Sequence, residues 1–135
     1  MVDIGAIKLP STTLRLVTTD LFHIIAVSDW EAAIDHGALE PPSLSTEGFI
    51  HLSAIQQILR PANLLYRGRA DLVLLRIDAA KLDAELVWEP GSHGEAEDFP
   101  HLYGALNMDA VRGTISFPCG DDGGFVLPPE LAREG

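Results

Sequence analysis

Apolar residues gather in short runs along the chain, and the longest of these runs predict buried strands. Residues 21–27, LFHIIAV, are apolar except for His23, which suits a central strand buried on both faces. Residues 71–78, DLVLLRID, form a second run of this kind. Further strands are predicted at residues 12–18, 85–89 and 111–117.

Two segments have the periodicity of helices. Ser28 and Glu31 have the spacing of a capping box, and Gly37 is a natural C-terminal stop for the helix that they begin. Ser53 begins a second capping-box pattern, so it is predicted to cap the helix that follows. Pro61 lies inside that second helical pattern and predicts a kink or a restart there.

The other segments predict loops and, with the strands and helices, indicate the fold class. Residues 38–46 hold two consecutive prolines and predict a loop, as does the stretch 90–98, which is rich in glycine and acid. The tail beyond residue 118 is predicted to be loosely ordered, with an edge strand near 125–127. The order strand, helix, strand, helix and then mostly strands indicates a single α+β domain over residues 1–135, with a mixed or antiparallel sheet and two early helices.

Composition argues against some classes of binding partner and favours one cellular compartment. The chain has 135 residues and a net charge of −11, with 9 basic and 20 acidic residues, which argues against binding to DNA, RNA or an anionic membrane. Cys119 is the single cysteine, so a disulfide framework is excluded and a reducing compartment is favoured. No signal peptide or membrane-spanning run is recognisable, and we expect a cytoplasmic protein.

Candidate chemistry is concentrated in residues 47–53, EGFIHLS. If this segment is a strand entered through Gly48, then Phe49, His51 and Ser53 share one face. His51 is either a reactive group or a buried histidine bonded to the backbone, and Ser53 is either part of a site or only a helix cap.

Two further histidines lie in apolar strand frames. A buried neutral imidazole at His23 needs a partner, and His51 on an adjacent strand would supply one. His101 and Tyr103 alternate in FPHLYG and could face the same cleft, or anchor a loop. Glu89 is either a general base or ribose anchor, or a solvated strand end. His36 and His93 are predicted to lie at the surface.

Motifs of other classes are missing from the sequence. His23, His51 and His101 could form a zinc site if they converge, but no paired histidine spacing supports it, and no metal is predicted. The nucleophile elbow, the phosphate-binding loop and the dinucleotide glycine pattern are likewise missing.

Five segments together resemble a known family. FHIIAVSDWEAA, PPSLSTEGFIHLS, DLVLLRID, LVWE and FPHLYGALNMDAV occur in the order typical of the domain of unknown function 952 family, with a family-like core at about residues 21–118. This family is remotely similar to the ADP-ribosyltransferase superfamily. The resemblance implies a split β-sheet that holds NAD in a cleft between its halves.

The resemblance also implies roles for individual residues. His23 matches the early-strand residue that contacts the nicotinamide ribose, and Gly48, His51 and Ser53 match the second-strand segment that frames the nicotinamide. The third position, where the superfamily often has Glu, would be His101 or else Glu89. This departure brings the chain nearer to the RNA 2′-phosphotransferase branch, or to a binder without chemistry.

The sequence thus leads to a working hypothesis with two alternatives. The hypothesis is a small ADP-ribosyltransferase-like protein that binds NAD or a related nucleotide and transfers a ribosyl or phosphoryl group. In it, His23, His51 and His101 are catalytic, and the ligand-binding residues are Gly48, Ser53, Tyr103 and Glu89. NAD would be a substrate, and no firm cofactor is predicted. The alternatives are a non-catalytic small-ligand module and a domain whose buried histidines are purely structural.

Overall fold

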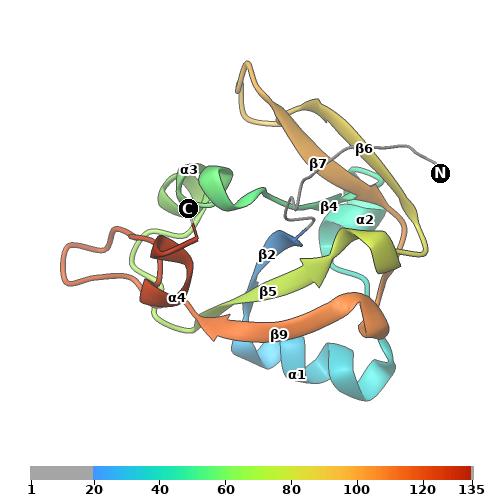
Figure 1. Ribbon diagram of the computed structural model, residues 1–135, viewed down its shortest axis with the longest axis horizontal. Helices are drawn as coiled ribbons and strands as arrows, with labels where there is room; N and C mark the ends of the chain where they lie inside the picture. The colour runs from blue at the N-terminus through green and yellow to red at the C-terminus, as the bar shows by residue number, and fades with distance from the viewer. Residues whose placement is uncertain (1–19, 135) are drawn as a thin grey trace, which may run out of the picture.

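A computed structural model describes residues 20–134 (Figure 1). The strands are β2 (Asp20–Ala26), β3 (Ala38–Leu39), β4 (Ile50–His51), β5 (Leu72–Asp78), β6 (Glu85–Pro90), β7 (Asp98–Tyr103), β8 (Leu106–Asn107) and β9 (Val111–Ser116). The helices are α1 (Val27–His36), α2 (Pro42–Thr46), α3 (Leu59–Leu65) and α4 (Pro129–Ala132), with 3-10 turns η1 (Ile55–Gln57), η2 (Ala79–Lys81) and η3 (Met108–Ala110).

The first sheet has the strand order β2-β5-β9, and both of its strand pairs are antiparallel. Strand β2 pairs with β5 without interruption from Asp20↔Asp78 to Ala26↔Leu72. Alternate residues enter two separate cores, since Leu21 and Ile25 pack with the α1 side and Phe22 and Ile24 pack with α3 and α4. The sheet is therefore covered on both faces, as the apolar run at residues 21–27 predicts.

The second sheet has the order β4-β7-β6, again antiparallel, and β3 and β8 form a two-stranded ladder. Strand β4 contributes only two pairs, Ile50↔Leu102 and His51↔His101. One isolated bridge, Phe22↔Ser53, joins this sheet to the first. The α+β class with antiparallel sheets is thereby confirmed, and the two sheets are separate ladders held together by the continuation of β4.

The predicted helix after the first strand is confirmed, but its capping box is wrong. Helix α1 begins at Val27 with Ala26 at the N-cap, and no side chain caps it. The amide of Val27 donates to the carbonyl of Asp71 at 2.9 Å, which extends the β2–β5 pairing and starts the helix before Ser28 can act as a cap. At the other end, Gly37 has φ 96° and terminates the helix as expected.

Ser53 is not a helix cap either. Its amide and carbonyl both pair with Phe22, with N···O distances of 2.8 Å, so its backbone belongs to the bridge between the sheets. The turn η1 starts two residues later, and the Gln57 side chain accepts from the amide of Ala54 at 3.0 Å. The helix restarts at Ile58, between η1 and α3, rather than at Pro61 as predicted, and Pro61 falls in the first turn of α3, where a missing amide is tolerated.

Three other segments differ from the sequence prediction or lie outside the described residues. Residues 38–46 form β3 and α2 rather than only a loop. The predicted edge strand near residues 125–127 does not form, and the C-terminal segment instead buries Phe125 and Leu131 against the first sheet, where a loosely ordered tail was predicted. The predicted strand at residues 12–18 lies outside the described part of the chain.

Candidate functional site

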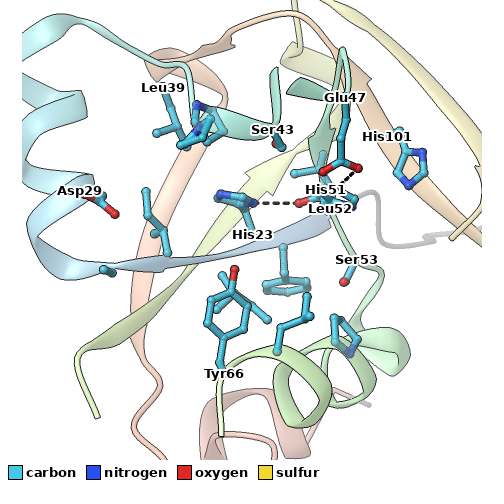
Figure 2. A pocket seen from close by; sticks show the side chains of 18 of the residues that line it. His23, Asp29, Leu39, Ser43, Glu47, His51, Leu52, Ser53, Tyr66 and His101 are labelled. Atoms are coloured by element: carbon cyan, nitrogen blue, oxygen red, sulfur yellow. Dashed lines mark hydrogen bonds and ion pairs between the residues drawn. The ribbon is translucent and has the colours of Figure 1, made fainter. Parts of the chain in front are cut away.

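A cleft of about 730 Å³ lies where the two sheets meet, and Figure 2 shows its side chains. Its walls come from β2, α1, the segment 38–43, the continuation of β4 to Ser53, α3 and the β6–β7 connection. The volume lies in the range of small-molecule sites, roughly 300–1,000 Å³. All five histidines of the chain line this cleft, namely His23, His36, His51, His93 and His101.

His23 lies at the centre of the cleft on β2 (Figure 2). Its Nδ1–H donates to the backbone carbonyl of His51, with an N···O distance of 2.8 Å. Because a carbonyl only accepts, the proton is on Nδ1 and the lone pair is on Nε2. Burial lowers the pKa of His23 from 6.5 to about 4, so the ring is neutral at pH 7. Within residues 20–134, Nε2 has no hydrogen-bond partner.

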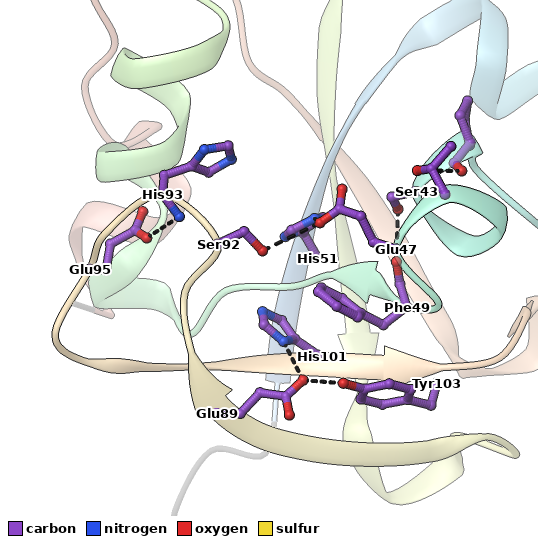
Figure 3. A network of polar contacts seen from close by, with 12 residues as sticks. Ser43, Glu47, Phe49, His51, Glu89, Ser92, His93, Glu95, His101 and Tyr103 are labelled. Atoms are coloured by element: carbon purple, nitrogen blue, oxygen red, sulfur yellow. Dashed lines mark hydrogen bonds and ion pairs between the residues drawn. The ribbon is translucent and has the colours of Figure 1, made fainter.

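A second polar group in the cleft lining is formed by Glu47, His51 and Ser92, and Figure 3 shows their contacts. His51 Nε2 donates to Glu47 Oε1 at 3.1 Å, and Ser92 Oγ donates to the same oxygen at 3.3 Å. The hydrogen bond from His51 is the main cause that holds the pKa of Glu47 below its usual value. The His93 ring lies over His51, with 6.4 Å between ring centroids.

The turn before β4 explains how Glu47 reaches His51. Glu47 is the C-cap of α2, and Gly48 has φ 93°, a left-handed conformation that reverses the chain into β4. The hydroxyl of Ser43 donates to the carbonyl of Phe49 at 2.8 Å and fixes the turn. The Glu47 side chain is thus directed back over the strand that carries His51 (Figure 3).

His101 lies on β7 directly opposite His51 and is 2% exposed. Its Nδ1 lies 2.7 Å from Glu89 Oε2, and the Tyr103 hydroxyl donates to the same oxygen. The hydrogen bond from Tyr103, and after it the one from His101, lowers the pKa of Glu89. The same hydrogen bond to Glu89 raises the pKa of Tyr103. Phe49 stacks on the His101 ring, with 4.0 Å between centroids. His101 Nε2 is buried without a hydrogen-bond partner in the described structure.

The structure brings four of the seven predicted site residues together at the cleft. His23, His51, His101 and Ser53 line it. The backbone of Ser53 also pairs with Phe22 and so helps to join the two sheets. Gly48, Glu89 and Tyr103 are not lining residues. Gly48 forms the turn, and Glu89 and Tyr103 lie on the far side of His101, where Glu89 binds its ring nitrogen and Tyr103 binds Glu89.

Several lining residues were missed by sequence reasoning. His36 and His93 are exposed, as predicted, but both also line the cleft, and Glu47 pairs with His51 on β4. Glu47 stood next to the glycine turn in the EGFIHLS segment, and that position was the signal that could have found it. His36 and His93 gave none, because only the folded topology brings the end of α1 and the β6–β7 connection to one cavity.

The charges around the cleft are mostly negative. The lining carboxylates are Asp29, Glu40, Glu47 and Glu95, whereas Arg69 is the single lysine or arginine in the lining that the described residues form. Arg69 is bound to Asp71 through two hydrogen bonds of 2.9 and 2.7 Å. Among residues 20–134, no group of three or more His, Cys, Asp or Glu side chains is arranged to hold a metal ion.

Comparison with models of protein families confirms the first family that the sequence resembles. Residues 24–114 match the model of a family described as protein of unknown function, DUF952. The chain belongs to this family. A search of curated proteins found no match. Within the described residues, no helix is long and apolar enough to cross a membrane.

Solved structures of one relative share the fold. Protein CC0527 from Caulobacter crescentus is 36% identical in sequence to this chain. Its crystal structure matches with a TM-score of 0.75, and the match covers 84% of this chain and 99% of the CC0527 chain. The solution NMR structure of CC0527 matches with a sequence identity of 34% and a TM-score of 0.69, and this match covers 87% of this chain and 97% of the CC0527 chain. These neighbours support an α+β member of the DUF952 family.

Proposed function

We propose that the cleft binds NAD or a related nucleotide and transfers its ribosyl group. The observation that carries this proposal is the convergence of all five histidines on one cleft between two antiparallel sheets. Imidazole rings can act as hydrogen-bond donors, acceptors and proton carriers, and sites of acid–base chemistry use them in these roles. The resemblance to ADP-ribosyltransferases, which hold NAD between two halves of a sheet, supplies the ligand class.

In this proposal the ligand lies with its ribosyl end toward the His23 and His51 side. His23 Nε2 would accept a hydrogen bond from a ribose hydroxyl, and the carboxylate of Glu47 would lie near the positive charge of the nicotinamide ring. Arg69, the cation in the described lining, would meet a phosphate. Ser53 would contact the ligand from the strand that joins the sheets.

The reaction would break the bond between C1′ of the ribose and the base nitrogen. The bonding electron pair leaves with nicotinamide, and positive charge develops on the ribosyl ring, which Glu47 stabilises. An acceptor hydroxyl then forms a bond to C1′. Its proton passes to His51 Nδ1, because His51 Nε2–H is directed at Glu47.

One observation favours the non-catalytic alternative, a small-ligand binding module. The third position of the superfamily pattern has no carboxylate directed into the cleft, because Glu89 is bound to His101 and Tyr103 behind the cleft wall. Such a module would bind the same ligands in the same cleft without breaking the glycosidic bond.

Calorimetry with NAD, combined with a chromatographic assay for nicotinamide, tests the proposal. The His51→Ala variant removes the ring but keeps the backbone carbonyl that holds His23, so it tests the side chain without breaking that contact. Asp121→Ala, in an exposed turn outside the cleft, is the control. We expect binding and nicotinamide release by the wild type and the control, both weakened in His51→Ala.

The outcomes separate the candidate functions. Binding without nicotinamide release supports the binding module. The absence of any binding by a folded wild-type protein eliminates the nucleotide proposal. The structural alternative would then apply, provided that His23→Ala and His51→Ala also unfold at clearly lower denaturant concentrations.

A further inference from the structure

Strand β2 lies at the edge of the first sheet, and its outer edge is covered for only part of its length. The isolated bridge to Ser53 covers it at Phe22, whose amide and carbonyl are both paired at 2.8 Å. If this antiparallel pairing continued, Ile24 would pair next with His51. Instead, the carbonyl of His51 accepts a hydrogen bond from the His23 side chain. The two sheets therefore separate at this point.

The separation leaves backbone groups of β2 unpaired. In an antiparallel strand, the backbone groups of alternate residues point to the same edge. Since those of Phe22 point to the outer edge, those of Ile24 and Ala26 do so as well. Among residues 20–134, no hydrogen bond is found to the amide or carbonyl of Ile24 or to the amide of Ala26. Both residues line the cleft, which therefore contains two free donors and one free acceptor of a strand edge.

A free strand edge is a template for another extended chain. Native proteins usually cover such an edge, and addition of a peptide strand to it is a recurring mode of recognition. A peptide residue opposite Ile24 would exchange a pair of hydrogen bonds with it, and the residue opposite Ala26 would accept a third. The bridge at Phe22 limits the pairing to these positions, so the bound segment is short.

The two sides of this edge differ in character. In Figure 2, β2 crosses the cleft with His23 on one side and Tyr66 on the other. The Tyr66 side is mainly apolar, since Pro61 and Leu65 of α3 also line the cleft there. The Tyr66 hydroxyl points toward β2 and has no hydrogen-bond partner in the part of the chain that the structure describes. Alternate side chains of an added strand would point to these two sides.

The His23 side is acidic. Glu47 lies on this side in Figure 2, as does Leu39, whose neighbour Glu40 is a further lining carboxylate. Arg69 is the cation of the described lining, and its guanidinium is bound to Asp71. The charge of the lining therefore favours a partner with positive side chains, and it disfavours a second copy of this chain, whose net charge is −11.

We propose that the outer edge of β2, at Ile24 and Ala26, binds an extended peptide segment in which lysine or arginine alternates with apolar residues. The segment would run antiparallel to β2, as β5 and the chain at Ser53 do. Its basic side chains would point toward Glu47 and its apolar side chains toward Tyr66. This inference goes beyond the proposed function and does not rest on it, because the peptide would fill the cleft in place of a nucleotide.

Calorimetry with three capped pentapeptides tests the partner's chemistry. The first alternates lysine and valine, the second has the same composition without the alternation, and the third has glutamate in place of lysine. We expect the alternating lysine peptide to bind at least about tenfold more tightly than either of the others, and more weakly as salt is added. No binding of this peptide, or equal affinities for the two lysine peptides, overturns the inference.

The variant Ala26→Pro tests the backbone pairing. Ala26 has φ −67° and ψ 143°, which proline adopts, and its amide makes no hydrogen bond in the described structure. The change therefore removes one donor from the edge and places a ring there. Ala79→Pro is the control, because it lies at the first position of η2, where proline is tolerated, and outside the cleft lining.

We expect Ala26→Pro to weaken binding of the alternating lysine peptide by at least about tenfold, and Ala79→Pro by less than about twofold. Urea unfolding checks that both variants are folded. Equal affinities of the two variants overturn the inference, since the peptide would then be held by charge alone.

Amide NMR of the wild-type protein provides a test that does not depend on the folding of a variant. Addition of the alternating lysine peptide should shift the amide proton signals of Ile24 and Ala26 to lower field, because both amides gain a hydrogen bond. Unchanged signals at both positions overturn the inference. The same shifts produced by raising the concentration of free protein also overturn it, because the occupant is then a second copy of the chain.

The result for this inference can be distinguished from that for the proposed function. Peptide binding at β2 without any binding of NAD supports the inference and eliminates the nucleotide proposal. Binding of NAD with nicotinamide release, but without binding of the lysine peptide, overturns the inference and supports the proposed function.

Discussion

The two three-stranded sheets of this protein differ in what their side chains do. In the first sheet, β2 and β5 pair over seven positions and send apolar residues into two cores. In the second, β4 contributes two pairs, one of which sets His51 opposite His101, and the network of Glu47, Glu89 and Tyr103 surrounds them. The strands of the first sheet carry more buried apolar residues than those of the second, whereas the second pairs two histidines of the candidate site, His51 and His101, across neighbouring strands.

The two sheets are connected in a way that places His23, on the first sheet, next to the backbone of the second. The bridge between Phe22 and Ser53 sets the end of β4 against β2, so the next residue of β2, His23, reaches the carbonyl of His51. A rigid element thereby positions an imidazole over a cleft whose other groups lie on short strands and turns. Precise placement of functional side chains by rigid elements is a general requirement of catalytic sites.

The largest effect is expected from a cavity in the first sheet. Leu74→Ala removes a fully buried side chain between two strands, and we expect unfolding to become easier by about 3–5 kcal/mol. The same change at Leu86, which is only partly buried on β6, should cost about 1–2 kcal/mol. Urea unfolding measures both, and equal losses would show that the two sheets contribute alike.

A somewhat smaller effect follows from the buried histidine of the first sheet. The pKa of His23 falls from 6.5 to about 4 on folding, so between these values the unfolded chain binds more protons than the native one. Stability is therefore lost as the pH falls from about 6.5 toward 4, by about 3 kcal/mol for a shift of this size. Above 6.5 both states are neutral at this residue, and the contribution is constant.

The matched variant for this prediction is His23→Asn. An asparagine amide can still donate to the carbonyl of His51, but it does not titrate. The difference in unfolding free energy between wild type and variant should therefore change with pH mainly between 6.5 and 4. Glu47 and Glu89 have lowered pKa values, so their contributions to stability are lost only below about pH 4.5. This loss occurs in both proteins. A pH-independent difference would contradict the neutral, buried imidazole.

The first sheet could be predicted from the sequence, because burial on both faces leaves a clear pattern. The apolar runs at residues 21–27 and 71–78 correspond to β2 and β5, and the helix that Gly37 terminates corresponds to α1. The α+β class follows from these elements and their order. Even here the capping boxes at Ser28 and Ser53 failed, because strand hydrogen bonds to Asp71 and Phe22 set where the chain leaves the sheet.

The candidate site was predicted only in part, because its short strands and turns have weak local signals. His23, His51 and His101 were recognised by their apolar frames, and all three line the cleft. The positions of Glu89 and Tyr103 behind His101 depend on the register of β6 with β7, which no local pattern specifies. His36 and His93 reach the cleft through the tertiary arrangement of α1 and the β6–β7 connection.

A third prediction compares a glycine of each sheet. Gly48, before β4, has φ 93° and open space where a Cβ atom would lie, so Gly48→Ala should cost about 1–2 kcal/mol through backbone strain alone. Gly113 in β9 has an ordinary φ and equally open space, so Gly113→Ala should be neutral or stabilising by up to about 1 kcal/mol. Thermal and urea unfolding measure both. Equal losses would mean that the Gly48 turn is not under conformational strain.

The smallest effect on stability, and the most informative about the cleft, is expected at Glu47. His51–Glu47 and His36–Glu40 have the same i,i+4 spacing, with N···O distances of 3.1 and 3.3 Å, and both line the cleft. Both pairs are substantially exposed, so Glu47→Gln and Glu40→Gln should each change the unfolding free energy by less than about 1 kcal/mol. Any difference in ligand affinity between the two variants must therefore come from contacts with the ligand.

That difference is predicted by the place of Glu47 beside His51 in the cleft and by its part in the proposed function. Its carboxylate would lie next to the charged end of nicotinamide riboside, so Glu47→Gln should weaken binding by about tenfold, and Glu40→Gln by less than about threefold. Calorimetry on both variants measures this ratio. If Glu40→Gln has the larger effect, the nicotinamide end of the ligand binds at the α1 end of the cleft, and the polar network of the second sheet serves to hold the strands rather than to recognise the ligand.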